Sequence, residues 1–249
     1  MSQKLRQEQI LYILQKEGYV TVKYLTEALH YSSATINRDL NAMQTLGLVK
    51  RSYGGVEAAT RKKLPPLPLR QFYMKKEKRR NAEAAAKLIE NGETVFLDGS
   101  TSVEYMMPYL AEKKELTVIT NSLRLAIELG ERDIDVICLG GRILERPHVL
   151  FGNETIENIA HYQFDKAFFS IDRITSDGSI IGGEYSYLIH RTMIKNSKET
   201  YLLTDRTKLC DRLEYVLCDF SALTGVISDF EFPDETKKLY PNVKFICTK

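Results

Sequence analysis

Residues 32–40 read SSATINRDL, and this stretch predicts a short helix with one apolar and one polar face. Ser32 or Ser33 can cap its amino end, because a serine hydroxyl accepts hydrogen bonds from the backbone N–H groups that the first helical turn leaves unpaired. Apolar side chains recur at helical spacing and are expected in a core, at Ile36, Leu40 and Met43. Asn37 and Arg38 would then project away from that core or flank it.

The sequence on either side of this helix extends the pattern. Residues 5–15 carry apolar side chains at helical spacing, and Thr21 can cap a second short helix. After the third helix come two short strand-like runs around the glycine pair at 54–55. Two glycines permit the positive φ angles that a tight hairpin needs. Three helices followed by a hairpin predict a winged helix-turn-helix domain over residues 1–58.

The polar face of the third helix has side chains suited to double-stranded DNA. A recognition helix brings its amino-terminal residues to base edges, where asparagine can pair with adenine and arginine with guanine. Serine, threonine and the helix amino end suit phosphates, and the hairpin would hold the adjacent backbone. The candidate DNA-binding residues are Ser32, Ser33, Thr35, Asn37, Arg38, Lys50, Arg51 and Tyr53. The alternative is that Arg38 and Asp39 merely pair on a solvated surface.

Charge is distributed unevenly along the chain. Residues 1–80 contain 16 Lys and Arg against 6 Asp and Glu, whereas residues 81–249 contain 19 against 27. The first part therefore carries a net charge of +10 and the remainder −8. Binding to DNA draws on the release of counterions from phosphates, which needs local Lys and Arg. A basic amino-terminal part alone is also compatible with a solvated surface. The charge therefore adds to the evidence from the helix-turn-helix motif but does not by itself indicate DNA binding.

The composition restricts the classes of protein that fit. The 249 residues are 43% hydrophobic and 27% charged, which is typical of folded domains. No apolar run approaches 18 residues and the amino terminus has no apolar signal core, so we expect a cytoplasmic protein without a membrane partner. The cysteines lack metal-ligand spacing, and no metal or cofactor is expected. They are Cys138, Cys210, Cys218 and Cys247.

A second domain is expected after a linker. Three prolines at 65, 66 and 68 oppose regular helix, which places the linker at residues 59–75, and a basic run after it could start a helix through 81–90. From there to residue 249, short apolar runs alternate with helical stretches, a pattern typical of a largely parallel α/β sheet. The strand-like runs are residues 94–97, 116–120, 134–139, 166–171, 199–205, 214–219, 224–228 and 243–248.

Small polar and charged residues follow several of these runs, where ligands normally bind in parallel sheets. Glycine, serine and threonine at a strand-to-helix turn offer N–H and O–H groups to a phosphate. Lys208 could neutralise it, and Asp98 and Asp205 could bond sugar hydroxyls. The candidate effector-binding residues of this kind are Asp98, Gly99, Ser100, Thr101, Ser102, Asn121, Ser122, Gly140, Gly141, Arg142, Asp205 and Lys208. Each motif alone is more often just a helix cap.

The chain resembles the DeoR family of transcription regulators. Its helix-turn-helix signature is matched by Arg6, Ile10 and Leu14 followed by residues 32–40, except that Asn37 stands where the family usually has a basic residue. Further motifs of the family's sensor domain match Leu97–Ser102, Thr120–Ser122, Leu139–Gly141, Asp165–Phe168 and Thr204–Lys208. The resemblance implies an α/β sensor domain similar to sugar-phosphate isomerases and CoA transferases. It also implies a repressor and a phosphorylated sugar or polyol as effector.

Two departures from the family pattern would change which sugar fits. Glu184-Tyr185-Ser186 precede a helix that contains His190-Arg191-Thr192, and Asp172-Arg173 follow one of the strand-like runs. Asp172 and Glu184 therefore join the candidate effector-binding residues. They predict a non-standard effector or a weakened response.

Three functions stay open on the sequence alone. The favoured one is a ligand-controlled repressor that acts as a homo-oligomer, a dimer or tetramer, because such symmetry aligns recognition helices on repeated half-sites. The second is a sugar-phosphate isomerase fused to a DNA-binding module, with Glu184, Asp98 and Asp172 as candidate carboxylates. The third is an architectural DNA-binding protein whose second domain serves only for assembly. Fold likeness by itself does not transfer chemistry.

Overall fold

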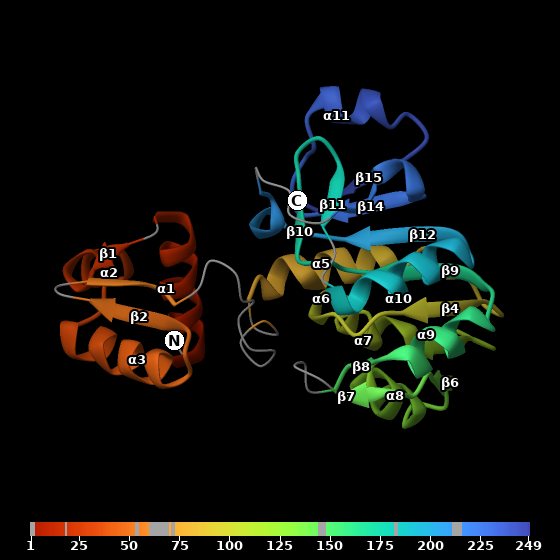
Figure 1. Cartoon of the computed structure of the whole chain (residues 1–249), viewed down its shortest axis with the longest axis horizontal. Coiled ribbons are helices and arrows are strands. Elements are labelled where there is room, and N and C mark those ends of the chain that lie inside the picture. Colours follow the sequence, from red (N-terminus) through yellow and green to blue (C-terminus); the bar gives the residue numbers. More distant parts are fainter. Residues whose placement is uncertain are drawn as a thin grey trace. The chain divides into compact units, whose positions relative to one another are not determined.

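The chain is divided into two units, an N-terminal unit of residues 1–73 and a C-terminal unit of residues 74–249 (Figure 1). The computed structural model describes residues 3–17, 19–52, 55–59, 70, 73–143, 148–181, 184–210 and 216–249. Each unit has its own hydrophobic core.

The described residues of the N-terminal unit form helices around a small antiparallel sheet, with strand order β1-β3-β2. This arrangement confirms the predicted winged helix-turn-helix. Thr21 caps α2 and Ser32 caps α3, each by accepting a backbone N–H in the first turn. The elements are α1 (Gln3–Glu17), β1 (Val20–Thr21), α2 (Val22–Leu29), α3 (Ser33–Thr45), β2 (Val49–Ser52) and β3 (Gly55–Ala58).

The core of this unit contains the side chains that the helical spacing predicted. Ile36, Leu40 and Met43 of α3 are fully buried, together with Ile10 of α1 and Leu25 of α2. Because these residues lie on one side of α3, the opposite side is left for solvent or a partner.

A buried ion pair joins α1 to α3. Arg6 donates from Nε and Nη2 to the carboxylate of Asp39, and its guanidinium lies 4.8 Å from the ring centre of Tyr31. Asp39 is fully buried, and both of its carboxylate oxygens accept hydrogen bonds from Arg6. The alternative interpretation, in which Asp39 pairs with Arg38 on a solvated surface, is therefore wrong.

The C-terminal unit alternates strands and helices along the chain. Up to the middle of the unit these are α5 (Lys75–Ala86), β4 (Thr94–Leu97), α6 (Thr101–Glu104), α7 (Met107–Leu110), β5 (Thr117–Thr120), α8 (Leu123–Gly130), β6 (Asp135–Cys138), β7 (Arg142–Ile143), β8 (Leu150–Phe151), α9 (Asn153–Ala160) and β9 (Phe164–Phe169). The rest are β10 (Arg173–Ile174), β11 (Ser179–Ile181), α10 (Glu184–Lys195), β12 (Ser197–Leu203), η1 (Arg206–Lys208), β13 (Val216–Asp219), η2 (Phe220–Ala222), β14 (Gly225–Ser228), α11 (Asp234–Leu239) and β15 (Lys244–Cys247).

Seven described strands form one parallel sheet in the order β15-β14-β12-β9-β4-β5-β6. Helices pack on both of its faces, with α9 and α10 contributing to one hydrophobic core and α5, α7 and α8 to the other. From β4 the chain winds outward through β5 and β6, then returns past β4 to β9 and winds the other way. The strand order thus reverses between β4 and β9, and such a switch point is where open α/β sheets bind ligands.

One predicted strand differs from the structure. The run at 214–219 gives β13, which lies outside the parallel sheet and pairs antiparallel with β11. A parallel neighbour needs a long crossover connection, and only the short turn η1 is described between β12 and β13. Between β4 and β5 lie two short helices, α6 and α7, and Pro108 lies in the first turn of α7.

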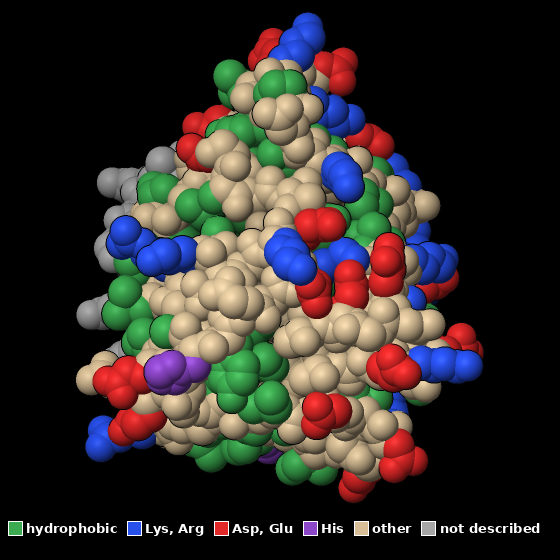
Figure 2. Space-filling model, turned by 90° about the vertical axis from the view of Figure 1, so that its right-hand side faces the viewer, with side chains coloured by type: hydrophobic (Ala, Val, Ile, Leu, Met, Phe, Trp, Pro, Cys, Tyr) green, Lys and Arg blue, Asp and Glu red, His purple; other side chains and the backbone are tan. Residues whose placement is uncertain are grey.

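Ion pairs lie at the amino ends of β4, β9 and β12. Lys166 pairs with Glu93, and Nζ of Lys198 lies 2.7 Å from Oδ1 of Asp165. On the face drawn in Figure 2, acidic and basic side chains lie beside one another without a continuous basic surface. That face therefore lacks the single-sign charge that a polyanion would need.

None of the helices in the described ranges is both long and apolar enough to cross a membrane.

Candidate functional site

The polar face of α3 exposes several of the predicted DNA-binding residues. Ser32, Ser33 and Arg38 are exposed, as is Lys50 on β2. Ser32 Oγ accepts from the backbone N of Thr35 at 3.3 Å and lies 2.9 Å from the Thr35 hydroxyl. The helix therefore presents hydroxyl groups at its amino end and a basic side chain one turn later. Tyr53, also predicted, lies outside the described residues.

Arg51 connects the hairpin to the same face of α3. Its Nη2 donates to Oδ1 of Asn37 at 2.6 Å, and its Nη1 donates to Oδ1 of Asn41 at 2.7 Å. Asn37 in turn donates from Nδ2 to the backbone O of Ser33 at 2.9 Å. The side chains predicted to read bases and to hold the backbone thus form one hydrogen-bonded group.

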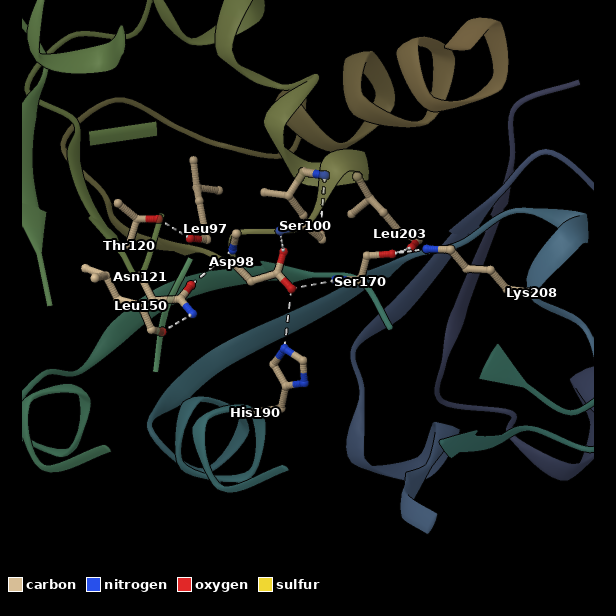
Figure 3. Close-up of polar contacts among 12 residues, drawn as sticks. Leu97, Asp98, Ser100, Thr120, Asn121, Leu150, Ser170, His190, Leu203 and Lys208 are labelled. Atoms are coloured by element: carbon tan, nitrogen blue, oxygen red, sulfur yellow. Dashed lines mark hydrogen bonds and ion pairs between the residues drawn. The ribbon is translucent and has the colours of Figure 1, made fainter. Parts of the chain in front are cut away.

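Asp98 is the centre of the second candidate site, at the switch point of the parallel sheet (Figure 3). It follows β4 directly, and its Oδ1 accepts from Ser100 N at 3.1 Å. Its Oδ2 accepts from Ser170 N at 3.2 Å and lies 3.3 Å from Nε2 of His190. Only 5% of Asp98 is exposed. The carboxylate therefore joins the carboxyl ends of β4 and β9 to α10.

Ser170 and Lys208 extend this group toward β12 (Figure 3). Nζ of Lys208 donates to Oγ of Ser170, which donates to the backbone O of Leu203 at 2.5 Å. Asp205 is buried and accepts from the backbone N of Thr207 at 3.0 Å. The carboxylate of Asp205 thus caps η1, the turn that carries Lys208.

The loop after β4 is buried between neighbouring segments. Gly99 N donates to Oδ1 of Asn121 at 3.0 Å, and Nδ2 of Asn121 donates to the backbone O of Leu150 at 3.2 Å. A Cβ atom on Gly99 would lie 2.8 Å from Cγ2 of Val149, so the close approach needs glycine. Ser122, predicted for effector contact, accepts from Leu125 N and caps α8.

A buried lysine lies beside the same loop. Nζ of Lys78, on α5, donates to the Thr101 hydroxyl at 3.0 Å, and both side chains are at most 5% exposed. Ser100 caps α6, and Ser102 is buried. A lysine amine therefore lies next to the hydroxyl-rich loop, although Lys78 was not among the predicted residues.

Three residues of the site were missed by sequence reasoning, namely Lys78, Ser170 and His190. Ser170 lies inside the run predicted at 166–171, whereas β9 ends at Phe169, so only the structure shows that Ser170 follows its strand as Asp98 follows β4. His190 was noted only as a departure from the family pattern, and Lys78 only as part of a basic run. The structure gives His190 Nδ1 no hydrogen-bond partner among the described residues, although only 7% of the side chain is exposed.

Predicted effector residues 140–142 lie at the edge of the sheet, away from the switch point. Gly140 and Gly141 follow β6, the edge strand, and pack against Thr155, whose hydroxyl donates to Gly140 O at 2.8 Å. Arg142 is exposed on β7, where it pairs with β8. Asp172 lies two residues after Ser170 and is partly buried. Glu184 begins α10, and its side chain lies outside the described residues.

Two observations on the described residues concern metal binding and the thiol of Cys218. These contain no group of three or more His, Cys, Asp or Glu side chains that could hold a metal ion. Burial raises the pKa of Cys218 to about 12, and the nearby Asp219 acts in the same direction. Cys218 is therefore a neutral thiol near pH 7, without the thiolate that metal binding or nucleophilic chemistry uses.

Two family models match the chain, one for each unit. A DeoR-like helix-turn-helix domain matches residues 6–62, and a DeoR C terminal sensor domain matches residues 74–230. The glycerol-3-phosphate regulon repressor of Escherichia coli (strain K12) is 31% identical over 92% of this chain and 92% of its own length. The lactose phosphotransferase system repressor of Lactococcus lactis subsp. lactis is 31% identical over 84% of each chain.

Solved structures resemble the chain at lower sequence identity. The eIF2B beta structure from Chaetomium thermophilum has a TM-score of 0.50 and 13% identity, over 84% of this chain and 58% of that chain. A ribose-5-phosphate isomerase structure in complex with phospho-erythronic acid has a TM-score of 0.42 and 18% identity, over 56% of each chain. The chain thus spans little more than half of these structures. The eIF2B likeness shows a shared fold alone, and the isomerase likeness supports no argument.

Proposed function

The chain belongs to the DeoR family of DNA-binding transcription regulators, and we propose that it represses a carbohydrate catabolic operon until a phosphorylated sugar or polyol releases it. The family model for the sensor domain alone matches more than half of the chain. The resemblance predicted from Arg6 and the stretch at 32–40 is thereby confirmed. Curated relatives named as repressors of a glycerol-3-phosphate regulon and of a lactose phosphotransferase system support the proposed kind of operon.

We assign DNA binding to the amino-terminal part of the chain, and effector binding and assembly to the carboxyl-terminal part. Residues 1–58 bind operator DNA through the exposed face of α3 and the β2–β3 hairpin, residues 59–75 link, and residues 76–249 bind the effector and assemble the oligomer. The net charge of +10 over residues 1–80, against −8 over the remainder, supports DNA binding by the first part. Ser32, Ser33 and Thr35 suit phosphates, and Arg38 is exposed where it can reach a base edge.

The observation that carries the effector proposal is the convergence of Asp98, Ser170, His190 and Lys208 at the switch point. A phosphorylated sugar has a dianionic end and several hydroxyl groups. Lys208 and Lys78 supply positive charge for the phosphate, and the loop at 99–102 supplies hydroxyls and backbone N–H groups. Asp98 and the unpartnered Nδ1 of His190 can bond sugar hydroxyls.

We propose that this site binds its ligand without converting it. Sugar-phosphate isomerisation needs a positioned general base. Both carboxylate oxygens of Asp98 already accept hydrogen bonds from Ser100, Ser170 and His190, which suits a fixed acceptor better than a proton carrier. Turnover of ribose 5-phosphate or a related substrate by the purified chain, lost on Glu184→Gln, would instead support the isomerase alternative.

The proposed mechanism is a population shift in a dimer or tetramer. Oligomerisation through the C-terminal unit aligns recognition helices on repeated half-sites. The effector stabilises an arrangement in which they no longer match that spacing. A useful switch needs a coupling free energy of about 1–3 kcal/mol between the two sites.

The test is the release of DNA by defined compounds. Duplexes selected from a randomised pool by the purified chain would be titrated in a gel shift assay with a panel of sugar and polyol phosphates. We expect one class of phosphorylated compound to release the duplex, and the matching unphosphorylated compound to have no effect. Release by none of them, with millimolar or weaker binding by calorimetry, would refute sensing of small sugar phosphates. An architectural protein would bind DNA regardless of every compound.

A further inference from the structure

The contacts of Arg51 give this residue a more specific role than holding the DNA backbone. It lies on β2, yet its guanidinium reaches two amide oxygens on α3, Oδ1 of Asn37 at 2.6 Å and Oδ1 of Asn41 at 2.7 Å. We propose that Arg51 reads a base together with α3, and that Asn37 positions Arg51 instead of reading a base itself. The proposal rests on the DNA-binding function proposed above and names the residues that would set its sequence preference.

Asn37 has both ends of its amide engaged with the protein. Its Oδ1 accepts from Arg51, while its Nδ2 donates to Ser33 O at 2.9 Å and to Ser33 Oγ at 3.3 Å. An asparagine reads adenine bidentately only when both the oxygen and the nitrogen are directed at the base. Asn37 would have to break its contacts with Arg51 and with Ser33 to do this. It is therefore better suited to hold Arg51 than to bond a base.

Arg51 keeps enough donors to read a base while it is held. A guanidinium has five N–H groups, and two of them bond Asn37 and Asn41. The other three have no hydrogen-bond partner among the described residues, and bidentate recognition of guanine needs two. Two amide contacts also restrict the side chain before DNA arrives, so less rotational freedom is lost on binding.

The position of the two asparagines places Arg51 along the middle of α3. Asn37 and Asn41 are one helical turn apart and lie on the same side of the helix. Their oxygens both face Arg51, so the Nδ2 of the exposed Asn41 is directed away from it, as a further donor on this surface. Every one of these contacts is made within the N-terminal unit, between its hairpin and its third helix.

The experiment compares base preference with overall affinity. The full-length chain selects duplexes from a randomised pool, and its affinity is then measured for every single-base-pair variant of the selected site at several salt concentrations. The variants are Arg51→Ala, Arg51→Lys and Asn37→Ala, and Lys50→Ala is the matched control from the same strand. Circular dichroism and thermal unfolding of each variant establish that its fold is retained.

We expect Arg51→Ala to bind the selected site at least about fivefold more weakly. It should also lose its preference for one base over the others at one base pair of each half-site. Arg51→Lys should lose the same preference, because an ammonium keeps the charge but cannot make the bidentate hydrogen bonds that a planar guanidinium makes to a base. Asn37→Ala should weaken preference at that same base pair. Lys50→Ala should weaken binding to all duplexes alike.

Two results would overturn the proposal while leaving DNA binding intact. One is an Arg51→Ala variant that weakens all duplexes equally and lowers the salt dependence, or an Arg51→Lys variant with unchanged preference, since either marks a phosphate contact. The other is an Asn37→Ala variant that relaxes preference at a different base pair, which would make Asn37 a base-reading residue. If the wild-type chain selects no duplex at all, the DNA-binding function itself is wrong.

Discussion

At the scale of single residues, Arg38 is the exposed basic side chain of α3 that we propose for base recognition. We predict that Arg38→Ala lowers specific affinity by about 1–3 kcal/mol, the contribution of one bidentate contact to guanine. Fluorescence anisotropy with a selected duplex and a scrambled duplex measures the difference. Arg38→Ala binding the selected duplex like wild type would mean that α3 does not carry the base contacts.

Arg6 and Asp39 form the buried ion pair that holds α1 against α3. Asp39 is fully buried, so removal of the guanidinium leaves its charge without compensation. We predict that Arg6→Met lowers the free energy of unfolding of the N-terminal unit by about 3–5 kcal/mol. Urea titration followed by circular dichroism measures this change. Lys23→Ala, which breaks an exposed pair with Glu27, is the control and should have little effect. If Arg6→Met and Lys23→Ala lowered the free energy of unfolding equally, a structural role for Arg6 would be contradicted.

Among elements, the turn from β4 into α6 is a closely packed part of the proposed effector site. A Cβ on Gly99 would lie within 3 Å of both γ carbons of Val149, which are not the ends of a flexible side chain. We predict that Gly99→Ala costs about 1–3 kcal/mol of stability and weakens effector binding, because the loop must move. Thermal unfolding and calorimetry measure the two effects.

Two further variants make this prediction specific. Adding Val149→Ala to Gly99→Ala should recover most of the stability, because it removes the atoms that the new methyl group meets. Gly130→Ala, at the end of α8, has open space around its Cβ position and should not destabilise the unit. A double variant as unstable as Gly99→Ala alone would show that Val149 is not the cause.

At the scale of the whole molecule, regulation requires the two sites to be coupled. If the effector lowers affinity for DNA by some factor, DNA must lower affinity for the effector by the same factor. We predict a factor of about 5–150 in both directions, measured by calorimetry and anisotropy. Lys208→Ala should abolish the effector response and leave affinity for DNA unchanged. Lys198→Ala, at the opposite end of β12, is the control, since its partner is Asp165. A factor close to 1 would mean that the two sites are not coupled and that this compound does not regulate DNA binding.

Local patterns in the sequence predicted the local structure well. Thr21 and Ser32 cap the helices expected of them, because a cap depends on one side chain and the backbone two or three residues later. Ile36, Leu40 and Met43 are buried because helical spacing alone puts them on one face. β13 was misplaced, because its apolar run is equally compatible with a parallel or an antiparallel neighbour, and the length of the connection decides between them.

The sequence by itself determined the strands of the parallel sheet, the winged helix-turn-helix, the family and the strand-end loops that surround a candidate ligand site. Only the tertiary structure decided that Asp98, Ser170, His190 and Lys208 meet, and that Arg51 bonds Asn37 and Asn41. The physical reason is separation along the chain. Helical and strand periodicity describe neighbours a few residues apart, whereas these contacts join segments up to 92 residues apart that only strand order and packing bring within hydrogen-bonding distance.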